Sequence, residues 1–372
     1  MLRSVFVFCC HVELLEHIIL SQAEKCNENY PFLSMAYSIG LSHILNCNKV
    51  QRGQGGDGME QLFMIFPERM RKALLRAELS IERLQEIRLR VGRPVLLRYG
   101  GTEYGLTKDG HLTDADDPAG MCPLEEELSQ VLEYASGYSV YAFYEEIRQG
   151  FFTIAGGHRI GVAGKVVMDA SGVQEVRHIS FLNVRVSHQI IGCAEPVLPY
   201  LLQDGLCHTL IISPPGCGKT TLLRDLIRII SNGSRQLPGK TVGVVDERSE
   251  LAGCCRGVPQ NDIGMRTDIL DGCRKAEGMQ MLLRAMAPEV IAVDEIGNER
   301  DRDALEAAFH CGCKLLATAH GRSLSDIKRR PLIGYMAERG MFERFIILGK
   351  EAGVGAVRQI LDSAGAVLYC TC

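Results

Sequence analysis

The segment 213–221 combines glycine, lysine and hydroxyl residues at a spacing that could hold phosphate. It matches the pattern G-x-x-x-x-G-K-[ST], except that Ser213 stands at the first glycine position. In such loops backbone N–H groups surround the phosphates, the lysine adds positive charge and the next hydroxyl binds Mg²⁺. Lys219 and Thr220 stand at the last two of these positions. We predict nucleotide contact along the whole loop: Ser213, Pro214, Pro215, Gly216, Cys217, Gly218, Lys219, Thr220 and Thr221.

The elements on either side of this loop are those that a phosphate site needs. The apolar run 208–213 predicts a strand before the loop. Apolar residues then recur at helical spacing from Leu222 to Ile230, so a helix should begin at the loop and direct its N-terminus at the phosphates. An incidental glycine-rich turn would lack this order of strand, loop and helix. The segment therefore predicts ATP binding, with Cys217 as a thiol inside the site.

A pair of acids follows a later apolar run. The run 289–294 predicts a strand that ends in Asp294, and Glu295 comes next. Asp294 would hold Mg²⁺ together with Thr220, and Glu295 could polarise the attacking water. A solvated acid pair at a strand end is the alternative, but the phosphate loop upstream favours a catalytic role.

Two further strand ends carry polar groups. The run 241–246 is followed by Glu247 and Glu250, and the run 314–318 is followed by His320. Ligands on open α/β sheets lie at the carboxyl ends of the strands, so we expect these side chains near the nucleotide. Thr318 or His320 could sense the γ-phosphate, although a lone histidine is more often structural.

The spacing of apolar runs predicts an α/β architecture after about residue 200. Continuous Val, Ile and Leu runs are typical of strands buried on both faces of a mostly parallel sheet, and we expect five: 208–213, 241–246, 289–294, 314–318 and 344–348. The polar, glycine-rich segment 264–278 predicts a loop with a short helix, followed by a helix at 279–287. Arg266 in that segment could contact phosphate or a neighbouring subunit, or remain a surface charge.

The region 59–200 predicts a smaller α+β domain without a nucleotide signature. The segment 87–97 alternates apolar and basic residues, as expected of a strand with a cationic face, and 124–134 is an amphipathic helix. Further strands are expected as a Gly-Gly hairpin at 150–165 and as short runs at 176–177 and 183–187. The basic, aromatic surface could be solvated or could contact a polyanion or a subunit. Arg185 near the domain junction could complete a neighbouring nucleotide site.

Residues 1–58 differ from the rest of the chain, which gives domain boundaries of 1–58, 59–200 and 201–372. They show no clear periodicity and end in a glycine-rich stretch before Met59. One interpretation is a small helical extension with a flexible linker. The other, which we favour, is that Met59 is the true start, because Gly-Gly-Asp-Gly requires G-rich codons like those of a bacterial ribosome-binding site.

Composition excludes several broad classes. The chain has 372 residues, a net charge of −4 and 23% charged residues, which does not suit a nucleic-acid packaging protein or a disordered chain. The 15 cysteines are scattered, without a secretory leader or zinc-ligand spacing, so we expect reduced thiols in the cytoplasm. No run approaches the roughly 20 apolar residues that span a bilayer, so any membrane association requires a partner.

Six segments together carry a family resemblance. They are GGHRIGVAGKV, SPPGCGKTTLLRDLIR, VGVVDERSEL, GMRTDILDGC-KAEGM, VIAVDEIG and ATAHG, in order between residue 59 and about 365. In this set the chain resembles the stage III sporulation protein AA family, ATPases of endospore-forming bacteria. That family is similar to the hexameric ATPases of type II and type IV secretion. Arg274 departs from the pattern, which has proline there, and residues 1–58 match nothing in the family.

The resemblance implies an architecture, a site and a cellular role. The fold would be a RecA/AAA-type P-loop ATPase domain of the α/β class, preceded by the smaller α+β domain, with ATP and Mg²⁺ as cofactors. Glu247 and Glu250 match acids of the secretion ATPases, His320 their histidine motif and Arg185 their arginine finger. The protein would form a homo-oligomer, a hexamer. In the mother-cell cytoplasm it would dock on membrane channel proteins of the sporulation operon and power, or help to assemble, the channel to the forespore.

Three alternatives to this motor remain open. The basic N-terminal surface would also suit an ATPase that depends on single-stranded nucleic acid, which we do not favour. A nucleotide-binding scaffold without turnover would not need intact Lys219, Asp294 and Glu295. A small-molecule kinase is the weakest alternative, because the chain shows no obvious lid for an acceptor.

Overall fold

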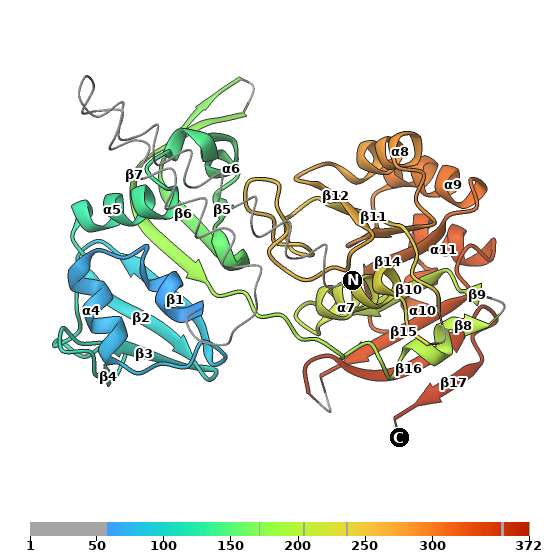
Figure 1. Cartoon of the computed structure of the whole chain (residues 1–372), viewed down its shortest axis with the longest axis horizontal. Helices are drawn as coiled ribbons and strands as arrows, with labels where there is room; N and C mark the ends of the chain where they lie inside the picture. Colours follow the sequence, from blue (N-terminus) through green and yellow to red (C-terminus); the bar gives the residue numbers. More distant parts are fainter. Residues whose placement is uncertain (1–57, 171, 204, 236, 351–352, 372) are drawn as a thin grey trace, which may run out of the picture. The chain divides into compact units, whose positions relative to one another are not determined.

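The computed structural model describes residues 58–371, except 171, 204, 236 and 351–352 (Figure 1). The expectations for residues 1–58 therefore lie almost entirely outside the described residues. In the described part, no helix is long and apolar enough to cross a membrane. The ten cysteines of this part are all free thiols.

The first half of the described chain forms a seven-stranded antiparallel sheet in the order β4-β3-β2-β1-β7-β6-β5. The strands are β1 (Leu84–Arg90), β2 (Arg93–Tyr99), β3 (Thr102–Leu106), β4 (Leu112–Thr113), β5 (Phe151–Thr153), β6 (Arg159–Asp169) and β7 (Gly172–Arg185). Side chains alternate between the two faces of a strand, so Ile87, Leu89, Leu182 and Val184 all reach the same buried face.

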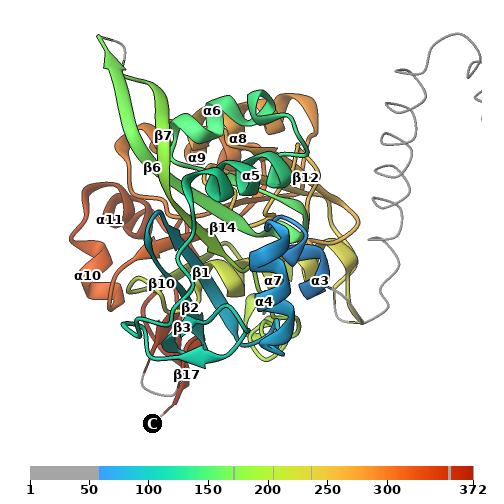
Figure 2. The ribbon, with the colours of Figure 1, turned by 90° about the vertical axis from the view of Figure 1, so that its left-hand side faces the viewer.

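Helices cover that buried face. They are α3 (Gly58–Phe63), α4 (Glu68–Arg76) and α5 (Glu125–Ala135), and the short elements η1 (Val140–Phe143), α6 (Tyr144–Arg148) and η2 (Ala155–Gly157) complete this region. Figure 2 shows α4 and α5 in front of the strands. Phe63 and Phe66, near the start of the described residues, and Leu128 of α5 pack into one apolar core with the strands. The amphipathic pattern at 124–134 therefore predicted α5 to within one residue.

Two expectations for these strands were wrong in detail. The segment 87–97 is two strands instead of one, because Val91 and Gly92 turn the chain between β1 and β2, with Gly92 at a φ of 68°. The short runs 176–177 and 183–185 belong to the single strand β7, which pairs with β6 along most of its length, and residues 186–187 follow that strand. The Gly-Gly hairpin is confirmed, since β5 and β6 pair across Gly156 and Gly157, both at positive φ.

The second half forms an eight-stranded sheet in the order β12-β11-β13-β14-β10-β15-β16-β17. The strands are β10 (Thr209–Ser213), β11 (Val242–Asp246), β12 (Thr267–Asp271), β13 (Val290–Val293), β14 (Lys314–His320), β15 (Arg344–Gly349), β16 (Ala356–Asp362) and β17 (Val367–Cys370). The first six strands in this order are parallel, and β16 and β17 are antiparallel. All five strands predicted from apolar runs are present, and the fold is α/β.

Helices and a separate apolar core lie on each face of this sheet. The helices are α7 (Lys219–Asn232), α8 (Lys275–Ala285), α9 (Arg302–His310), α10 (Leu324–Lys328) and α11 (Pro331–Glu338), with η3 (Leu198–Leu201), β8 (Leu202–Gln203), β9 (Gly205–Leu206) and η4 (Glu299–Asp301) in the connections. The α7 residues Leu223 and Ile227 pack with Ile211 of β10 on one face. The neighbouring Leu210 and Ile212 pack on the other face, against α8, α9 and α11.

The segment 264–278 differs from its prediction as a loop with a short helix. It contains the edge strand β12, and α8 begins at Lys275, four residues earlier than expected. An edge strand has a neighbour on only one side and leaves much of its surface in water, so β12 carries aspartates at Asp268 and Asp271 where a buried strand would be apolar. Because of these polar residues, the segment lacks the continuous apolar run that predicted the other strands. The antiparallel strands β16 and β17 were not predicted.

The apolar cores of the two sheets separate between Val186, the last residue of the first core, and Ala194, the first residue of the second. Since no core residue lies between these two positions, the change of core falls slightly before residue 200. We keep a division into 59–200 and 201–372 as a proposal.

Candidate nucleotide site

The loop between β10 and α7 has the backbone of a phosphate cradle. Gly216 and Gly218 have φ values of 68° and 86°, a region that glycine enters without a steric penalty. Gly218 is also tightly packed, because a Cβ there would come within 3.0 Å of the Gly355 Cα. The Gly355 N–H donates to the Cys217 carbonyl at 3.1 Å, so the connection after β15 supports the loop. Sequence reasoning missed this support.

Three amide groups of the loop find no acceptor among the residues that the structure describes. In the described part of the chain, the backbone N–H groups of Gly216, Cys217 and Gly218 form no hydrogen bond. Unpaired amides that precede a helix form an anion site, because the helix dipole adds partial positive charge there. These residues therefore fit phosphate oxygens. The Cys217 thiol is buried, which shields it from solvent despite its place in the loop.

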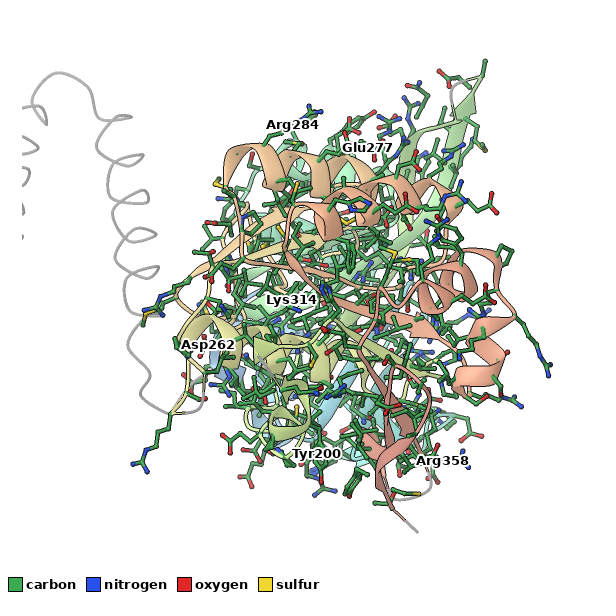
Figure 3. All side chains as sticks on the ribbon, turned by 90° about the vertical axis from the view of Figure 1, so that its right-hand side faces the viewer. Tyr200, Asp262, Glu277, Arg284, Lys314 and Arg358 are labelled. Carbon is green, nitrogen blue, oxygen red and sulfur yellow. The ribbon has the colours of Figure 1, made fainter. Side chains whose placement is uncertain are left out.

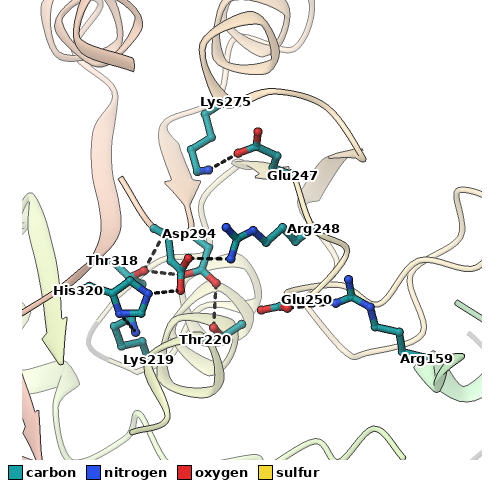
Figure 4. Close-up of polar contacts among 11 residues, drawn as sticks. Arg159, Lys219, Thr220, Glu247, Arg248, Glu250, Lys275, Asp294, Thr318 and His320 are labelled. Atoms are coloured by element: carbon teal, nitrogen blue, oxygen red, sulfur yellow. Dashed lines mark hydrogen bonds and ion pairs between the residues drawn. The ribbon is translucent and has the colours of Figure 1, made fainter. Parts of the chain in front are cut away.

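Thr220, Asp294 and Thr318 form one hydrogen-bonded group at the carboxyl ends of the strands (Figure 4). Thr220 Oγ1 donates to Asp294 Oδ2 at 2.8 Å, and Thr318 Oγ1 donates to Asp294 Oδ1. The carboxylate comes from the end of β13, and β14 separates that strand from β10. A carboxylate beside a hydroxyl at the helix start is a donor set that suits Mg²⁺, which prefers oxygen ligands and retains water. The residues predicted to hold the metal are thus adjacent.

Glu295 is held on both of its carboxylate oxygens. His320 Nε2 lies 2.8 Å from Glu295 Oε1, and Arg248 Nη1 lies 3.0 Å from Glu295 Oε2. The backbone of Glu295 is in the left-handed region, with a φ of 50°, and its N–H donates to Thr318 Oγ1 at 2.8 Å. A non-glycine residue in this region is strained and persists only where its surroundings impose it. The site therefore fixes the direction of this carboxylate.

Lys219 reaches the same network through His320. Its Nζ lies 3.2 Å from His320 Nδ1. An ammonium can only donate, so Nδ1 accepts and the neutral imidazole carries its hydrogen on Nε2, toward Glu295. Lys219, which is 5% exposed, His320 and Glu295 thus form a continuous chain of contacts from the loop to the acid.

The turn after β11 is organised by a buried aspartate. Asp246 accepts the N–H groups of Glu250, Leu251 and Ala252 at 2.8, 2.9 and 2.9 Å. Burial raises the pKa of Asp246 to about 6, and the three N–H donors only partly oppose that effect. Arg224 of α7 closes the other side by donating to the carbonyls of Glu250 and Leu251.

The two acids of this turn face different partners. Glu247 pairs with Lys275 at the start of α8. Glu250 Oε1 pairs with Arg159 Nη1 of β6 at 3.1 Å, and the Arg159 guanidinium also lies 3.3 Å from the centre of the Phe151 ring. A small pocket at this edge of the sheet is lined by Asp246, Glu247, Arg248, Glu250, Lys275, Asp294 and Glu295.

Two arginines that the sequence singled out make no contact with the acids of the candidate site among the described residues. Arg185 is exposed on β7, next to Arg159 across the strand pair, and forms no hydrogen bond or ion pair with any described residue. Arg266 donates to the carbonyls of Ser231 and Asn232 at the end of α7, and its role as a phosphate or inter-subunit contact stays a prediction. The last carbonyl groups of a helix have no N–H partner within it, and the Arg266 guanidinium donates to two of those of α7.

Sequence reasoning missed Arg159, Arg248 and Lys275. Arg248 lies one residue beyond Glu247, and Lys275 begins the KAEGM motif, so both were in the motifs without an assigned role. Arg159 follows the Gly-Gly turn, and nothing in its sequence position indicates which of several arginines reaches Glu250. That selection depends on how the two sheets meet.

The fold and the site define an α/β protein with a glycine-rich loop before α7 and acids at the carboxyl ends of a mostly parallel sheet. The model of the family "Sporulation stage III, protein AA" matches residues 57–368. The chain is 44% identical over 317 residues to stage III sporulation protein AA of Bacillus subtilis (strain 168), covering 83% of this chain and 97% of that protein. The chain belongs to this family.

Solved secretion and pilus ATPases are similar in fold. The ATPase DotB of Legionella pneumophila matches with a TM-score of 0.48 and 17% identity, over 76% of this chain and 77% of that one. The pilus retraction motor PilT with bound ADP matches with a TM-score of 0.46 and 14% identity, over 71% and 74%.

Proposed function

We propose that this chain is a Mg²⁺-dependent ATPase with its site at the carboxyl edge of the eight-stranded sheet. One observation carries the proposal. Lys219, Thr220, Asp294, Glu295 and His320 come from three separate segments and form a single network beside the loop whose amides lack acceptors. Family membership supports it.

Each residue would have a distinct task. The amides of Gly216 and Gly218 and the ammonium of Lys219 would bind the phosphate oxygens. Thr220 and Asp294 would hold Mg²⁺, which when bound neutralises charge on the β- and γ-phosphates. These contacts place the terminal phosphate in front of the acids that follow β11 and β13.

Glu295 would act on the attacking water. The water oxygen bonds to the γ-phosphorus, the bond to the β–γ bridging oxygen breaks, and ADP departs while the water proton passes to the Glu295 carboxylate. His320 lies between Lys219 and Glu295, so it would report whether Lys219 has turned toward a phosphate. Glu247 and Glu250 would orient water and metal from the neighbouring turn.

The cellular role is the second part of the proposal. Family membership supports a role in sporulation. We propose a homo-oligomer, a hexamer, in which Arg185 of one subunit completes the site of the next. The Arg159–Glu250 ion pair would couple the site to the seven-stranded sheet. The oligomer would act in the mother-cell cytoplasm, dock on channel proteins of the sporulation operon, and power or help to assemble the channel to the forespore.

Phosphate release with and without Mg²⁺, together with size-exclusion light scattering, tests the proposal. Lys219→Ala and Glu295→Gln should each lower kcat by about 100-fold or more, the range for loss of a phosphate contact or a general base. Glu299→Gln, an exposed acid on η4, is the matched control and should leave kcat unchanged. A wild-type chain that stays monomeric with Mg-ATP and releases no phosphate would overturn the motor.

The scaffold alternative has its own readout. Glu295→Gln should retain nucleotide binding while losing turnover, because Lys219 and the loop amides are intact. If cells that carry this variant sporulate like the wild type, turnover is dispensable and the protein is a nucleotide-binding scaffold.

A further inference from the structure

The outer face of the seven-stranded sheet carries a cavity away from the candidate nucleotide site. It has a volume of about 330 Å³ and is lined by Arg88, Leu89, Arg90, Gly150, Gly161, Val162, Ala163, Phe181, Leu182 and Asn183. Cavities of this size hold small molecules or single units of a polymer. None of its lining residues belongs to the network around Lys219.

The register of three strands explains why the cavity forms here. Arg90 is opposite Phe181 on β7, and Arg88 is opposite Asn183. Across the next pair, Asn183 is opposite Gly161 of β6. Side chains opposite one another in antiparallel strands are about 5 Å apart, so arginines form one wall while small residues leave the floor open. The strands β1, β7 and β6 are adjacent in the sheet (Figure 1). Together they supply the arginines, the aromatic ring and the small residues that line the cavity.

The charges of the cavity favour an anion. Arg88 pairs with Glu86 at 2.7 Å, which neutralises one guanidinium. Arg90 forms no ion pair with any described residue, and the exposed Arg185 adds a further positive charge on the same face. Guanidinium groups bind phosphate and carboxylate through paired N–H donors, so Arg90 suits an anion of this kind, and the groups beside it decide which anion fits.

Two further groups favour a flat polar ring beside the phosphate. Phe181 is 47% exposed, although a phenylalanine on a strand normally contributes to a core. Asn183 Oδ1 is buried and has no hydrogen-bond partner among the described residues. An unsatisfied buried oxygen destabilises the fold, and one that a structure retains requires an explanation, such as a functional role or a bound water or ion. Rotation of the carboxamide would offer both its donor and its acceptor to a nucleobase edge.

We propose that this cavity binds a nucleotide unit. Arg90, which has no acidic partner among the described residues, holds the phosphate, Phe181 stacks on the base, and Asn183 bonds to a base edge that carries an exocyclic amino group. The unit is a free mononucleotide or one residue of a single strand, since both present the same chemistry. Aromatic rings on an open sheet beside arginines bind single-stranded nucleic acid in this way. The site is independent of the proposed ATPase activity.

Binding is tested on the full chain in the Lys219→Ala background, which weakens the other nucleotide site. The probe is a fluorescein-labelled RNA of twelve adenosines, followed by anisotropy, with AMP as competitor. Arg90→Ala and Phe181→Ala should each weaken binding at least about ten-fold, the effect of losing a stacking or phosphate contact. Arg76→Ala removes one exposed arginine from α4, on the opposite side of the sheet, and should have no effect.

Two variants separate loss of binding from loss of folding. A Cβ on Gly161 would come no closer than 3.7 Å to its neighbours, so Gly161→Leu should fold normally while its side chain fills the cavity. Asn183→Leu removes the unsatisfied oxygen and should raise the melting temperature by about 2 °C while abolishing binding. If Gly161→Leu and Asn183→Leu both fold and both lose binding, the cavity is the binding site.

The outcomes show whether the bound nucleotide is free or part of a strand, and whether the ligand is a nucleotide or an acidic protein. Binding of RNA that AMP does not displace identifies a strand as the source, and binding of AMP alone identifies a mononucleotide. Either outcome supports the site if Arg90→Ala and Gly161→Leu abolish it. Absence of binding by both probes overturns the proposal. So does displacement by a poly-glutamate peptide with no dependence on Phe181 or Asn183, which would assign the face to an acidic protein partner. ATP hydrolysis by the wild type is measured separately, so the two proposals can fail independently.

Discussion

Arg248 is the residue that most directly restrains the proposed general base. It is largely exposed, yet its guanidinium lies 3.0 Å from Glu295 Oε2. A carboxylate oxygen engaged by a guanidinium is less available to accept a proton from water. Exposed ion pairs contribute about 0.2–1 kcal/mol, so Arg248→Gln should raise kcat by about 1.4- to five-fold.

Steady-state phosphate release under saturating Mg-ATP measures this effect. Arg300→Gln, an exposed arginine on η4 at the same edge of the sheet, serves as the control and should not change kcat. A decrease in kcat for Arg248→Gln would instead place the guanidinium among the groups that bind the phosphates.

Asp246 gives the stability of the protein a predictable pH dependence. Its pKa is raised to about 6, from an ordinary value of 3.8, because it is buried. The folded state then holds a proton that the unfolded state has lost between these two values. The stabilisation is complete below pH 3.8 and is lost as the pH rises through 6.

Urea denaturation of wild type and Asp246→Asn at pH 5 and pH 7 tests this sign. The asparagine does not titrate, so the difference in the free energy of unfolding, wild type minus variant, should fall by about 1 kcal/mol over this range. Other groups titrate equally in both proteins and cancel. A difference that stays constant or grows with pH would show that the backbone donors hold the carboxylate ionised.

At the scale of elements, the contact of α8 with β11 decides how the turn after β11 is placed. Gly278 of α8 is buried, and a Cβ at this position would lie 2.6 Å from Val245 Cγ1 and 3.3 Å from Cys273 Sγ. Alanine improves helix propensity by about 1 kcal/mol, but overpacking a tight contact costs about 1–3 kcal/mol. The steric cost should exceed the gain in helix propensity, because Val245 is a fully buried strand residue with no room to move.

Gly278→Ala should therefore destabilise the protein by about 1 kcal/mol, measured by urea denaturation. Gln280→Ala lies on the exposed side of the same helix, where Glu277 and Arg284 also lie (Figure 3), and reports propensity alone. An equal gain of stability in both variants would show that α8 moves away from β11 without penalty.

At the scale of the whole molecule, the two sheets have separate cores, which predicts that nucleotide stabilises the eight-stranded sheet first. The core of the first sheet ends at Val186, and the candidate site belongs to the eight-stranded sheet, whose cores begin at Ala194. A ligand that binds only the folded state at 100 times its Kd adds about 2.7 kcal/mol, which raises a melting temperature by roughly 5 °C or more. We expect Mg-ADP to raise the melting temperature of residues 201–372 more than that of residues 59–200. Differential scanning calorimetry measures both transitions.

Lys219→Ala is the control, because it should abolish the shift without removing either core. In Arg159→Ala, Mg-ADP should still raise the melting temperature of residues 201–372. The accompanying rise for residues 59–200 should be smaller, because Arg159 joins β6 to Glu250. A single transition that shifts as one unit in all three proteins would show that the two sheets unfold together.

The sequence by itself determined the site motifs and the strands that carry them. Continuous apolar runs predicted five parallel strands, because burial on both faces demands them, and glycine, lysine and acid spacing predicted Lys219, Thr220, Asp294 and Glu295. Local patterns suffice where chemistry and periodicity are contained in one segment. They failed for β12, whose edge position permits polar residues, and for the hairpin at Val91–Gly92.

Only the tertiary structure decided which residues meet. Nothing local shows that Arg159, instead of its neighbour Arg185, reaches Glu250, or that Arg248 and His320 hold the two oxygens of Glu295. The cavity beside Arg90 likewise exists only because β1, β7 and β6 align at one register. Contacts between segments depend on strand order and on the direction of each side chain, and neither is encoded in the spacing of residues along a single segment.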